Sequence, residues 1–464
     1  MLTHRATRRI GAGQNGLGRY VAALAGLPGA RAGRLLRALG PGAGILVLAL
    51  AVRLAYLAAD IQVPPQDTPD YDEIAVNLLA GEGFVARANW HGYALRSWRA
   101  PFYPFFLAAV YGVWGYSHAA VQWVQVLIGA FTAVLMYRLA RLTVPRAAVL
   151  TGILVALYGP LAASAAEVMT EVWYTFWSMG SVLLLWPAAT CAASGESRQP
   201  HTQPWRLIVG GIFLGLSALT RPVGLLLWPA LVVSAWSNAG TRGLVRAAVV
   251  FAALACVLAP WSMRNYRVHR SFVPVATHGG FIVARSNADA PAWRQERGWG
   301  IEPSVFVETP CEVERDRLWL RQGMGWIRAN PGAYLRLVTE RFVRLWYFFR
   351  PAYNFWFMLM MPFAVAGLWR HGRKPEFRLI VSFVGFSVLV FSFVLYGSTR
   401  FRLPLEPLLL LLAATVIVDG WDRLGPRRMT LLLTAAVAFN LLILWQENSV
   451  RRVVLRLLEG GGMK

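Results

Sequence analysis

Long apolar segments alternate with short, arginine-bearing polar segments along most of this chain. A membrane-spanning α-helix needs about 20 mainly apolar residues, and about eleven segments approach that length. The pattern therefore predicts an all-α polytopic membrane protein. The expected helices lie near residues 42–60, 119–138, 147–166, 171–193, 206–220, 223–237, 244–262, 353–369, 377–397, 403–420 and 428–445.

The arginines between these segments predict how the chain crosses the membrane. Seven arginines precede residue 42, so the N-terminus is expected in the cytoplasm. Residues 101–115 are apolar but short, and we expect them to lie at the membrane interface within a first external loop, 61–118. If they crossed, Arg138, Arg141 and Arg146 would face outward, against the positive-inside rule. The C-terminus is then outside, where its own arginines fit poorly, so a twelfth element or a miscounted helix stays open.

We expect three parts along the chain: a basic cytoplasmic tail (1–41), one transmembrane catalytic domain (42–445) and a C-terminal tail (446–464). A second long external loop covers residues 263–352. Its later half has the apolar spacing of helices, and Asn330 followed by Pro331 divides it into two. We expect both helices to lie along the outer leaflet.

The composition excludes several classes of protein. The chain is 56% hydrophobic and 15% charged, with a mean hydropathy of +0.46, which is too apolar for a soluble protein. The net charge of +23 comes from arginines beside apolar segments, as membrane topology and anionic lipids favour, so nucleic acid is not an expected partner. The three cysteines and seven histidines form no metal-ligand spacing, and no nucleotide-binding or serine-hydrolase motif is placed on a strand–helix unit.

An acidic segment follows the first expected helix, in a chain with 23 Asp and Glu against 46 Lys and Arg. Its members are Asp60, Asp67, Asp70, Asp72 and Glu73. Thr68 and Pro69 resemble a helix start and Gly81 a helix stop, so Asp67 would lie just before the positive end of a helix dipole. There it could accept a hydroxyl proton. The alternative, which the local sequence favours, is that Asp67 and Asp70 only cap and charge this helix.

The remaining candidates lie at the outer ends of membrane helices. Glu167 and Glu171 are the only ionisable residues between positions 149 and 193, and acids at membrane depth are functional candidates. Outer turns also carry four arginines, Arg221, Arg264, Arg400 and Arg402. Together they favour a phosphate site, because the guanidinium fork matches phosphate oxygens. Singly, each would be interpreted as an interface anchor.

Six motifs occur in a consistent order over about residues 45–420. They are DTPDYDEIAVNLLAGEGF, RAPFYP, MTEVWYTFW, ALTRPVG, APWSMRNY and STRFRLPLEP. The ordered set resembles the GT-C superfamily of membrane glycosyltransferases, especially the protein-mannosyltransferase and aminoarabinose-transferase type, glycosyltransferase family 39. The resemblance implies transfer of a sugar from a polyprenyl-phosphate carrier to an acceptor hydroxyl at the extracytoplasmic face of the inner membrane.

The resemblance also implies roles for particular residues. Asp67 matches the general base, with Asp70 a competitor, and Glu171 matches the second acidic position. Arg264 and Arg400 match residues near the lipid phosphate, with Arg221 and Arg402 in comparable turns. Tyr71, Arg99 and Tyr103, in the matching motifs, belong to the donor and acceptor pocket.

Three questions stay open. The acceptor is a lipid, a glycan or a protein. No cofactor is required, although a divalent cation between Asp67 and Glu171 is an option. Two other functions remain as alternatives: a polyprenyl-diphosphate-dependent ligase or polymerase, and a lipid or sugar transporter. A transporter would favour a site at mid-membrane on broken helices, whereas the charged candidates here gather at one face.

Overall fold

The computed structural model describes residues 29–59, 68–87, 93–190, 203–288, 311–349 and 353–460. Across these ranges the chain is helical, and the only β pairings are two isolated bridges, Ala86 with Leu95 and Phe349 with Tyr353. The expected all-α class is confirmed. Six helical segments are long and apolar enough to cross a membrane, so membrane-spanning character is supported, while the expected number of about eleven crossings stays a prediction.

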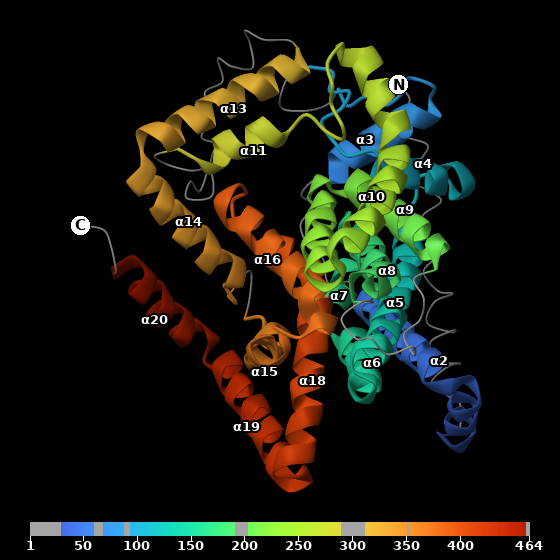
Figure 1. Ribbon diagram of the computed structural model, residues 1–464, viewed down its shortest axis with the longest axis vertical. Coiled ribbons are helices and arrows are strands. Elements are labelled where there is room, and N and C mark those ends of the chain that lie inside the picture. Colours follow the sequence, from blue (N-terminus) through green and yellow to red (C-terminus); the bar gives the residue numbers. More distant parts are fainter. Residues whose placement is uncertain are drawn as a thin grey trace, which may run out of the picture.

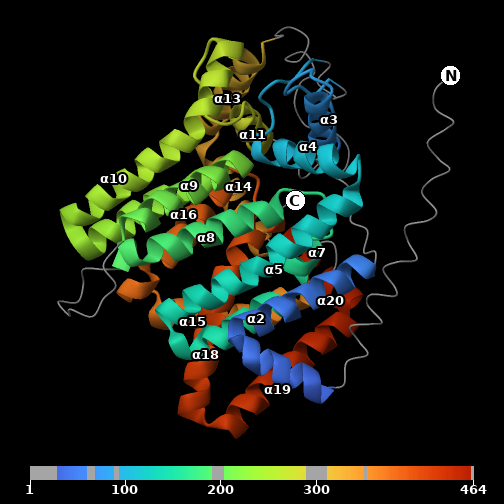
Figure 2. The same cartoon turned by 90° about the vertical axis from the view of Figure 1, so that its right-hand side faces the viewer.

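Five helices of the N-terminal half pack against one another along their lengths (Figure 2). They are α2 (Gly29–Ala58, kinked at Gly40), α5 (His118–Thr143), α6 (Ala148–Leu157), α8 (Glu171–Thr190) and α9 (Pro204–Thr220). One prediction here is wrong: the helix expected over 147–166 breaks at Tyr158 and resumes as α7 (Gly159–Ser164). Pro160 has no N–H to donate to the Ala156 carbonyl. That carbonyl instead lies 3.4 Å from the Arg53 guanidinium.

The helix α10 (Leu227–His269) consists of two antiparallel halves joined at Gly240. The indole nitrogen of Trp228 donates to the Ala247 carbonyl at 3.2 Å. In a straight helix nineteen residues would span about 28 Å, so the chain reverses between these residues. Gly240 permits the reversal with a φ of 55°. The two helices expected over 223–237 and 244–262 are therefore present, and the second continues to His269.

The C-terminal part packs around α18 (Glu406–Leu424), whose apolar residues are almost completely buried. Its neighbours include α15 (Phe355–His371) and α6. The other helices of this part are α16 (Arg378–Phe393), α17 (Thr399–Arg402), α19 (Pro426–Trp445) and α20 (Glu447–Gly460). The segment expected as a C-terminal tail thus contains a helix, α20, which is not among the helices long and apolar enough to cross a membrane.

The segments expected to lie outside the membrane gather mainly at one end of the molecule, and the last of them continues down beside α16 (Figures 1 and 2). They form α3 (Thr68–Leu79), α4 (Phe102–Trp114), α11 (Gly279–Ser286), α13 (Glu312–Ala329) and α14 (Pro331–Trp346). The predicted start of α3, the short α4 and the break at Asn330 are all observed, whereas α11 was not expected. An apolar cluster joins this layer to α10; its members include Ile74, Phe84, Trp98, Trp261, Phe281 and Trp319.

Candidate functional site

A cavity of about 290 Å³ lies beneath this layer, and its walls come from segments far apart in the sequence. We call it the polar pocket. The first external loop contributes Arg99, the end of α9 contributes Arg221, α11 contributes Arg285, and α17 contributes Arg400. Aromatic rings, among them that of Tyr396, complete the wall. The pocket is therefore an apolar frame that carries four guanidinium groups.

Two of these arginines are held by one buried carboxylate. Glu171 begins α8 and its side chain is 3% exposed. Its Oε1 atom accepts from Arg221 at 3.0 Å and also from Arg400 Nε. The two arginine side chains are 14% and 20% exposed. Because one negative charge faces two positive ones, this trio keeps a net positive charge at the pocket wall.

Arg99 is oriented by the acidic segment. Asp70 lies in the first turn of α3, and its Oδ2 atom accepts from Arg99 at 2.9 and 2.6 Å. The guanidinium also lies 5.3 Å from the centre of the Tyr71 ring, and both Tyr71 and Arg99 line the pocket. Asp70 itself lies behind Arg99. Asp67 falls outside the described residues.

Arg285 is a pocket residue that sequence analysis missed. Its guanidinium carbon lies 5.3 Å from the centre of the Tyr396 ring. It belongs to a long external loop, where arginines carry no topological information, and α11 is too short for a periodic signal. Four guanidiniums thus converge on one pocket, and the carboxylates of Asp70 and Glu171 hold three of them. Such a site attracts an anion.

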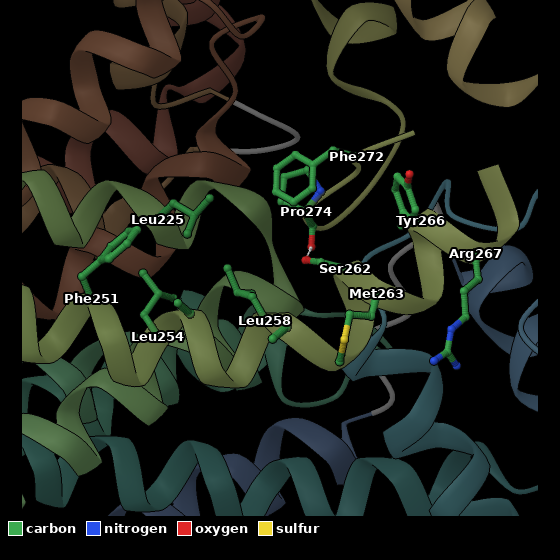
Figure 3. A pocket seen from close by; sticks show the side chains of 12 residues that line it. Leu225, Phe251, Leu254, Leu258, Ser262, Met263, Tyr266, Arg267, Phe272 and Pro274 are labelled. Carbon is green, nitrogen blue, oxygen red and sulfur yellow. Dashed lines mark hydrogen bonds between the residues drawn. The ribbon is translucent and has the colours of Figure 1, made fainter. Parts of the chain in front are cut away.

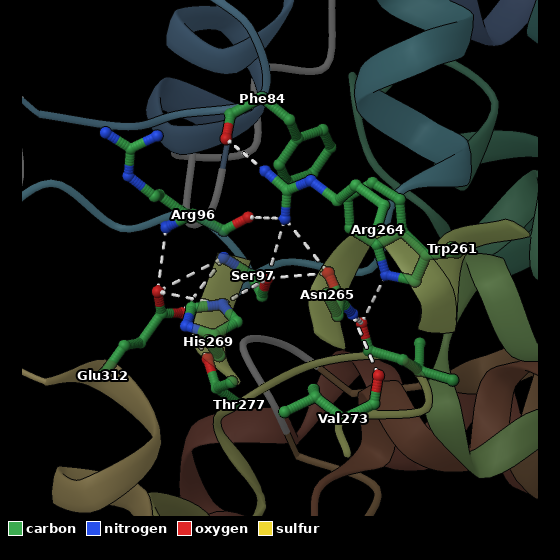
Figure 4. Close-up of polar contacts among 11 residues, drawn as sticks. Phe84, Arg96, Ser97, Trp261, Arg264, Asn265, His269, Val273, Thr277 and Glu312 are labelled. Atoms are coloured by element: carbon green, nitrogen blue, oxygen red, sulfur yellow. Dashed lines mark hydrogen bonds and ion pairs between the residues drawn. The ribbon is translucent and has the colours of Figure 1, made fainter. Parts of the chain in front are cut away.

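The structure does not bring Arg264 to the polar pocket. Its guanidinium donates to the carbonyls of Arg96 and Phe84 and to the side chains of Ser97 and Asn265, at 2.6 to 3.1 Å (Figure 4). Through these hydrogen bonds Arg264 connects the first loop to the end of α10. We call Arg264 and its four partners the loop clamp. The clamp fixes the backbone that leads directly to Arg99.

The loop clamp contains a Ser–His contact that is not arranged for nucleophilic catalysis. His269 Nε2 lies 2.8 Å from Ser97 Oγ, and Glu312 is 4.0 Å from that same nitrogen. Ser97 Oγ already donates its hydrogen to Asn265 Oδ1 at 2.8 Å. It therefore accepts from His269, whereas a nucleophilic serine gives its proton to the histidine.

Arg402 and Tyr103 also lie outside the pocket wall. Arg402 is 1% exposed, and it donates to Glu406 Oε1 at 2.6 Å and to the Leu345 carbonyl at 2.8 Å. The Tyr103 hydroxyl is buried and donates to Gln125 at 2.8 Å. Their hydrogen bonds join helices around the pocket.

Two further acids surround the site. Asp72 accepts from the hydroxyls of Tyr111 and Tyr116 and contacts His118, and so joins α3 to α4 and α5. Glu167 lies in the turn before α8. Burial, with the nearby charge of Glu171, raises the pKa of Glu167 to about 7, against the opposing effect of Arg400.

Comparison with solved structures identifies the fold. The archaeal oligosaccharyltransferase AglB from Archaeoglobus fulgidus, solved with an inhibitory peptide and a dolichol-phosphate, is similar with a TM-score of 0.55 at 14% identity. That match covers 87% of this chain and 54% of AglB. ArnT from Cupriavidus metallidurans, solved with undecaprenyl phosphate, has a TM-score of 0.53 at 17% identity, over 86% of this chain and 64% of ArnT. The chain has the fold of the GT-C membrane glycosyltransferases.

The GT-C resemblance expected from the ordered motifs is thus confirmed at the level of the fold. The chain spans about half the length of AglB and somewhat under two thirds of ArnT. No protein-family model matches the sequence, and no curated protein matches it. The likeness is therefore carried by the arrangement of the helices.

Residues that could hold a metal are few around the polar pocket in the described part of the chain. In the parts of the chain that the structure describes, no three His, Cys, Asp or Glu side chains gather as a metal site. The two pocket carboxylates, Asp70 and Glu171, face guanidiniums. The Archaeoglobus fulgidus oligosaccharyltransferase has also been solved with zinc and sulfate, a structure similar to this chain with a TM-score of 0.52 at 15% identity, over 86% of this chain and 51% of that one.

Proposed function

We propose that the protein transfers a sugar from a polyprenyl-phosphate carrier to an acceptor hydroxyl at the extracytoplasmic face of the membrane. The observation that carries the proposal is the convergence of Arg99, Arg221, Arg285 and Arg400 on one pocket. The GT-C fold and the lipid phosphates bound to its solved relatives support the same substrate class.

The leaving group determines what the site has to stabilise. When the bond between the anomeric carbon and the phosphate oxygen breaks, its electron pair stays on the phosphate, which gains a negative charge. Fixed cations aimed at that oxygen lower the barrier because they are oriented before the reaction. Arg221 and Arg400 suit this role, since Glu171 orients both while leaving net positive charge. In this proposal Glu171 is a positioning residue.

The acceptor hydroxyl forms the new bond to the anomeric carbon from the face opposite the phosphate, and loses its proton to a carboxylate. The acidic segment before and within the first turn of α3 supplies that base. Asp70 is the candidate with described geometry, at the edge of the pocket behind Arg99, and Asp67 is the candidate by motif. The proton ends on the carboxyl group, so charge and atoms balance.

The chemistry proposed here requires no nucleotide and no metal. The partners are a polyprenyl-phosphate sugar, an acceptor and the membrane. The outward location follows from the positive-inside rule applied to the N-terminal arginines. A transporter would use a mid-membrane site, whereas the polar pocket lies at the ends of the helices beneath the extramembrane layer.

The test is release of polyprenyl phosphate from a panel of synthetic polyprenyl-phosphate sugars by the full chain in lipid nanodiscs. General-base catalysis is worth about 10²–10⁴-fold, so Asp67→Asn or Asp70→Asn should lower release by about that factor while undecaprenyl phosphate still binds. Glu82→Gln is the matched control, because Glu82 forms an exposed ion pair with Arg87 in the same loop. Full release by the Asp67→Asn, Asp70→Asn double variant would refute the mechanism.

A further inference from the structure

The helix α11 carries Arg285, and it is too short to hold that residue in place by itself. It has eight residues, and isolated helices shorter than about 12 residues are marginal in water. Arg285 is its second-last residue and lines the polar pocket. The orientation of this guanidinium therefore depends on what fixes the two ends of α11.

The N-terminal end of α11 is fixed by α10 and α13. Ser262 of α10 donates to the Pro274 carbonyl at 3.0 Å, in the segment that enters α11 beside an apolar cavity of about 640 Å³ (Figure 3). Asp316 of α13 accepts from the backbone N–H groups of Gly280 and Phe281 at 2.7 and 3.1 Å. This end of the helix thus has anchors of its own.

A single guanidinium, that of Arg341 in α14, holds the other end. The Arg341 side chain is fully buried. Its Nη2 atom donates to the Ser286 carbonyl and, at 2.7 Å, to Asn287 Oδ1. Its Nη1 atom donates to the Phe393 carbonyl at 3.1 Å and to the Ser392 carbonyl at 3.4 Å. One nitrogen therefore serves the end of α11, and the other serves the end of α16.

The Arg341 guanidinium suits this place because two helices end there. The last carbonyls of a helix have no partner within the helix, and they carry the negative end of its dipole. A cation that donates to both ends satisfies these oxygens and meets favourable charge at each. Burial lowers the pKa of Arg341 to about 10, so the group remains charged at neutral pH.

The turn that follows α16 packs on the same residue. Gly397 in this turn has a φ of 55°, and a Cβ atom there would clash with the Arg341 carbonyl oxygen. The turn presents Tyr396 to the pocket, where the centre of its ring lies 5.3 Å from the Arg285 guanidinium carbon. Arg341 thus joins the two segments that meet at the pocket wall as Arg285 and Tyr396.

We propose that Arg341 is a positioning residue for the transfer reaction: it holds the end of α11 against the end of α16, so that Arg285 faces the lipid phosphate in the polar pocket. This inference rests on the proposed function and adds a residue to its site. Arg341 is not among the residues that line the pocket, and it acts through Arg285. A lysine cannot replace it, because one ammonium group lacks the planar fork whose two nitrogens reach two helices.

The test measures undecaprenyl phosphate binding by the full chain in lipid nanodiscs for Arg341→Lys, Arg285→Gln and the double variant. Arg285→Gln should weaken binding about tenfold or more, as expected for the loss of a hydrogen bond between charged groups. Arg341→Lys should weaken binding about fivefold in the wild-type background. It should have no effect in the Arg285→Gln background, because its effect passes through Arg285. Arg336→Lys, at an exposed position of α14, is the matched control.

A second variant leaves the Arg341 side chain intact. Gly397→Ala pushes the turn away from α14, so it should weaken binding by a similar factor, again only while Arg285 is present. Gly385→Ala, on α16, adds a methyl group with no neighbouring atom within 4 Å and is the matched control. Where Arg341→Lys does not fold, Gly397→Ala decides the question.

Two results would overturn the inference by showing a structural role only. One is a lower melting temperature of Arg341→Lys with normal binding; the other is equal weakening of binding with and without Arg285. Polyprenyl phosphate release by the wild-type chain is measured in parallel. Release together with additive effects would refute the positioning role and support the transferase, whereas coupled effects on binding without release from any donor would refute the transferase.

Discussion

Arg400 and Arg402 lie two residues apart on α17 in opposite environments, and exchanging each for glutamine separates a pocket role from a packing role. Arg400 lines the polar pocket and shares Glu171 with Arg221. Arg402 is enclosed, with its guanidinium bonded to Glu406 and 3.4 Å from the centre of the Phe357 ring. The two substitutions should therefore have different consequences.

Arg402→Gln should mainly destabilise the fold. Glu406 is 3% exposed, so the substitution leaves its carboxylate in the core without its cation. Removing one partner of a buried ion pair costs about 3–5 kcal/mol. The Leu345 carbonyl loses its donor as well. Because this is a large part of the stability of a typical protein, we expect a clear fall in the melting temperature.

Arg400→Gln should mainly reduce the transfer rate. Glu171 keeps Arg221 as a partner, so no buried carboxylate is left without a cation. The pocket loses one of its four guanidinium groups. Removing one preoriented group that stabilises a transition-state anion costs about 10²–10³ in kcat. Undecaprenyl phosphate should also bind more weakly.

The assays are thermal unfolding in detergent, undecaprenyl phosphate binding and polyprenyl phosphate release, each for both variants. The expected pattern is a stable, slow Arg400→Gln protein and an unstable Arg402→Gln protein whose remaining folded fraction releases polyprenyl phosphate at the normal rate. If the folded Arg402→Gln protein lost phosphate binding while Arg400→Gln kept it, the assignment of the pocket would be refuted.

Three further predictions concern the surroundings of the pocket. Arg264→Gln should lower kcat and weaken undecaprenyl phosphate binding together, because the loop clamp leads to Arg99, a pocket arginine; wild-type values of both would contradict this positioning role. The raised pKa of Glu167, about 7, means that wild-type stability falls as pH rises from about 4.5 through 7. Glu167→Gln should therefore raise the free energy of unfolding at pH 8 by up to about 3 kcal/mol, and with it the melting temperature, but should not do so at pH 4.5; equal effects at both would contradict the burial of its carboxyl. A chelator should leave polyprenyl phosphate release unchanged, and a loss restored by added Mg²⁺ or Mn²⁺ would show metal dependence.

The helices could be predicted because a run of about twenty apolar residues has few alternatives to a buried or membrane helix. The helix starts near Thr68 and the break at Asn330 follow from local backbone chemistry, and both are observed. The break at Tyr158 was missed because it depends on a tertiary partner. Pro160 alone would allow a kinked helix, and the Arg53 guanidinium offers the freed carbonyl of Ala156 another donor.

The sequence predicts which residues are candidates for the site, but not which of those candidates lie in the pocket. The sequence shows arginines at outer turns, and nothing in the local pattern distinguishes Arg264 and Arg402 from Arg221 and Arg400. What separates them is which acceptors the fold places around each guanidinium. Arg264 has four oxygen acceptors around it. These acceptors surround the guanidinium only after α10 and the first loop have packed together.

Carboxylates are scarce in this chain, and their positions decide where positive charge accumulates. Glu406 neutralises Arg402 inside the core, while one carboxylate, Glu171, serves both Arg221 and Arg400. Arg285 meets a tyrosine ring in the same pocket. The phosphate site proposed here is therefore the place where the fold brings several arginines to one pocket, which a count of arginines at outer turns does not reveal.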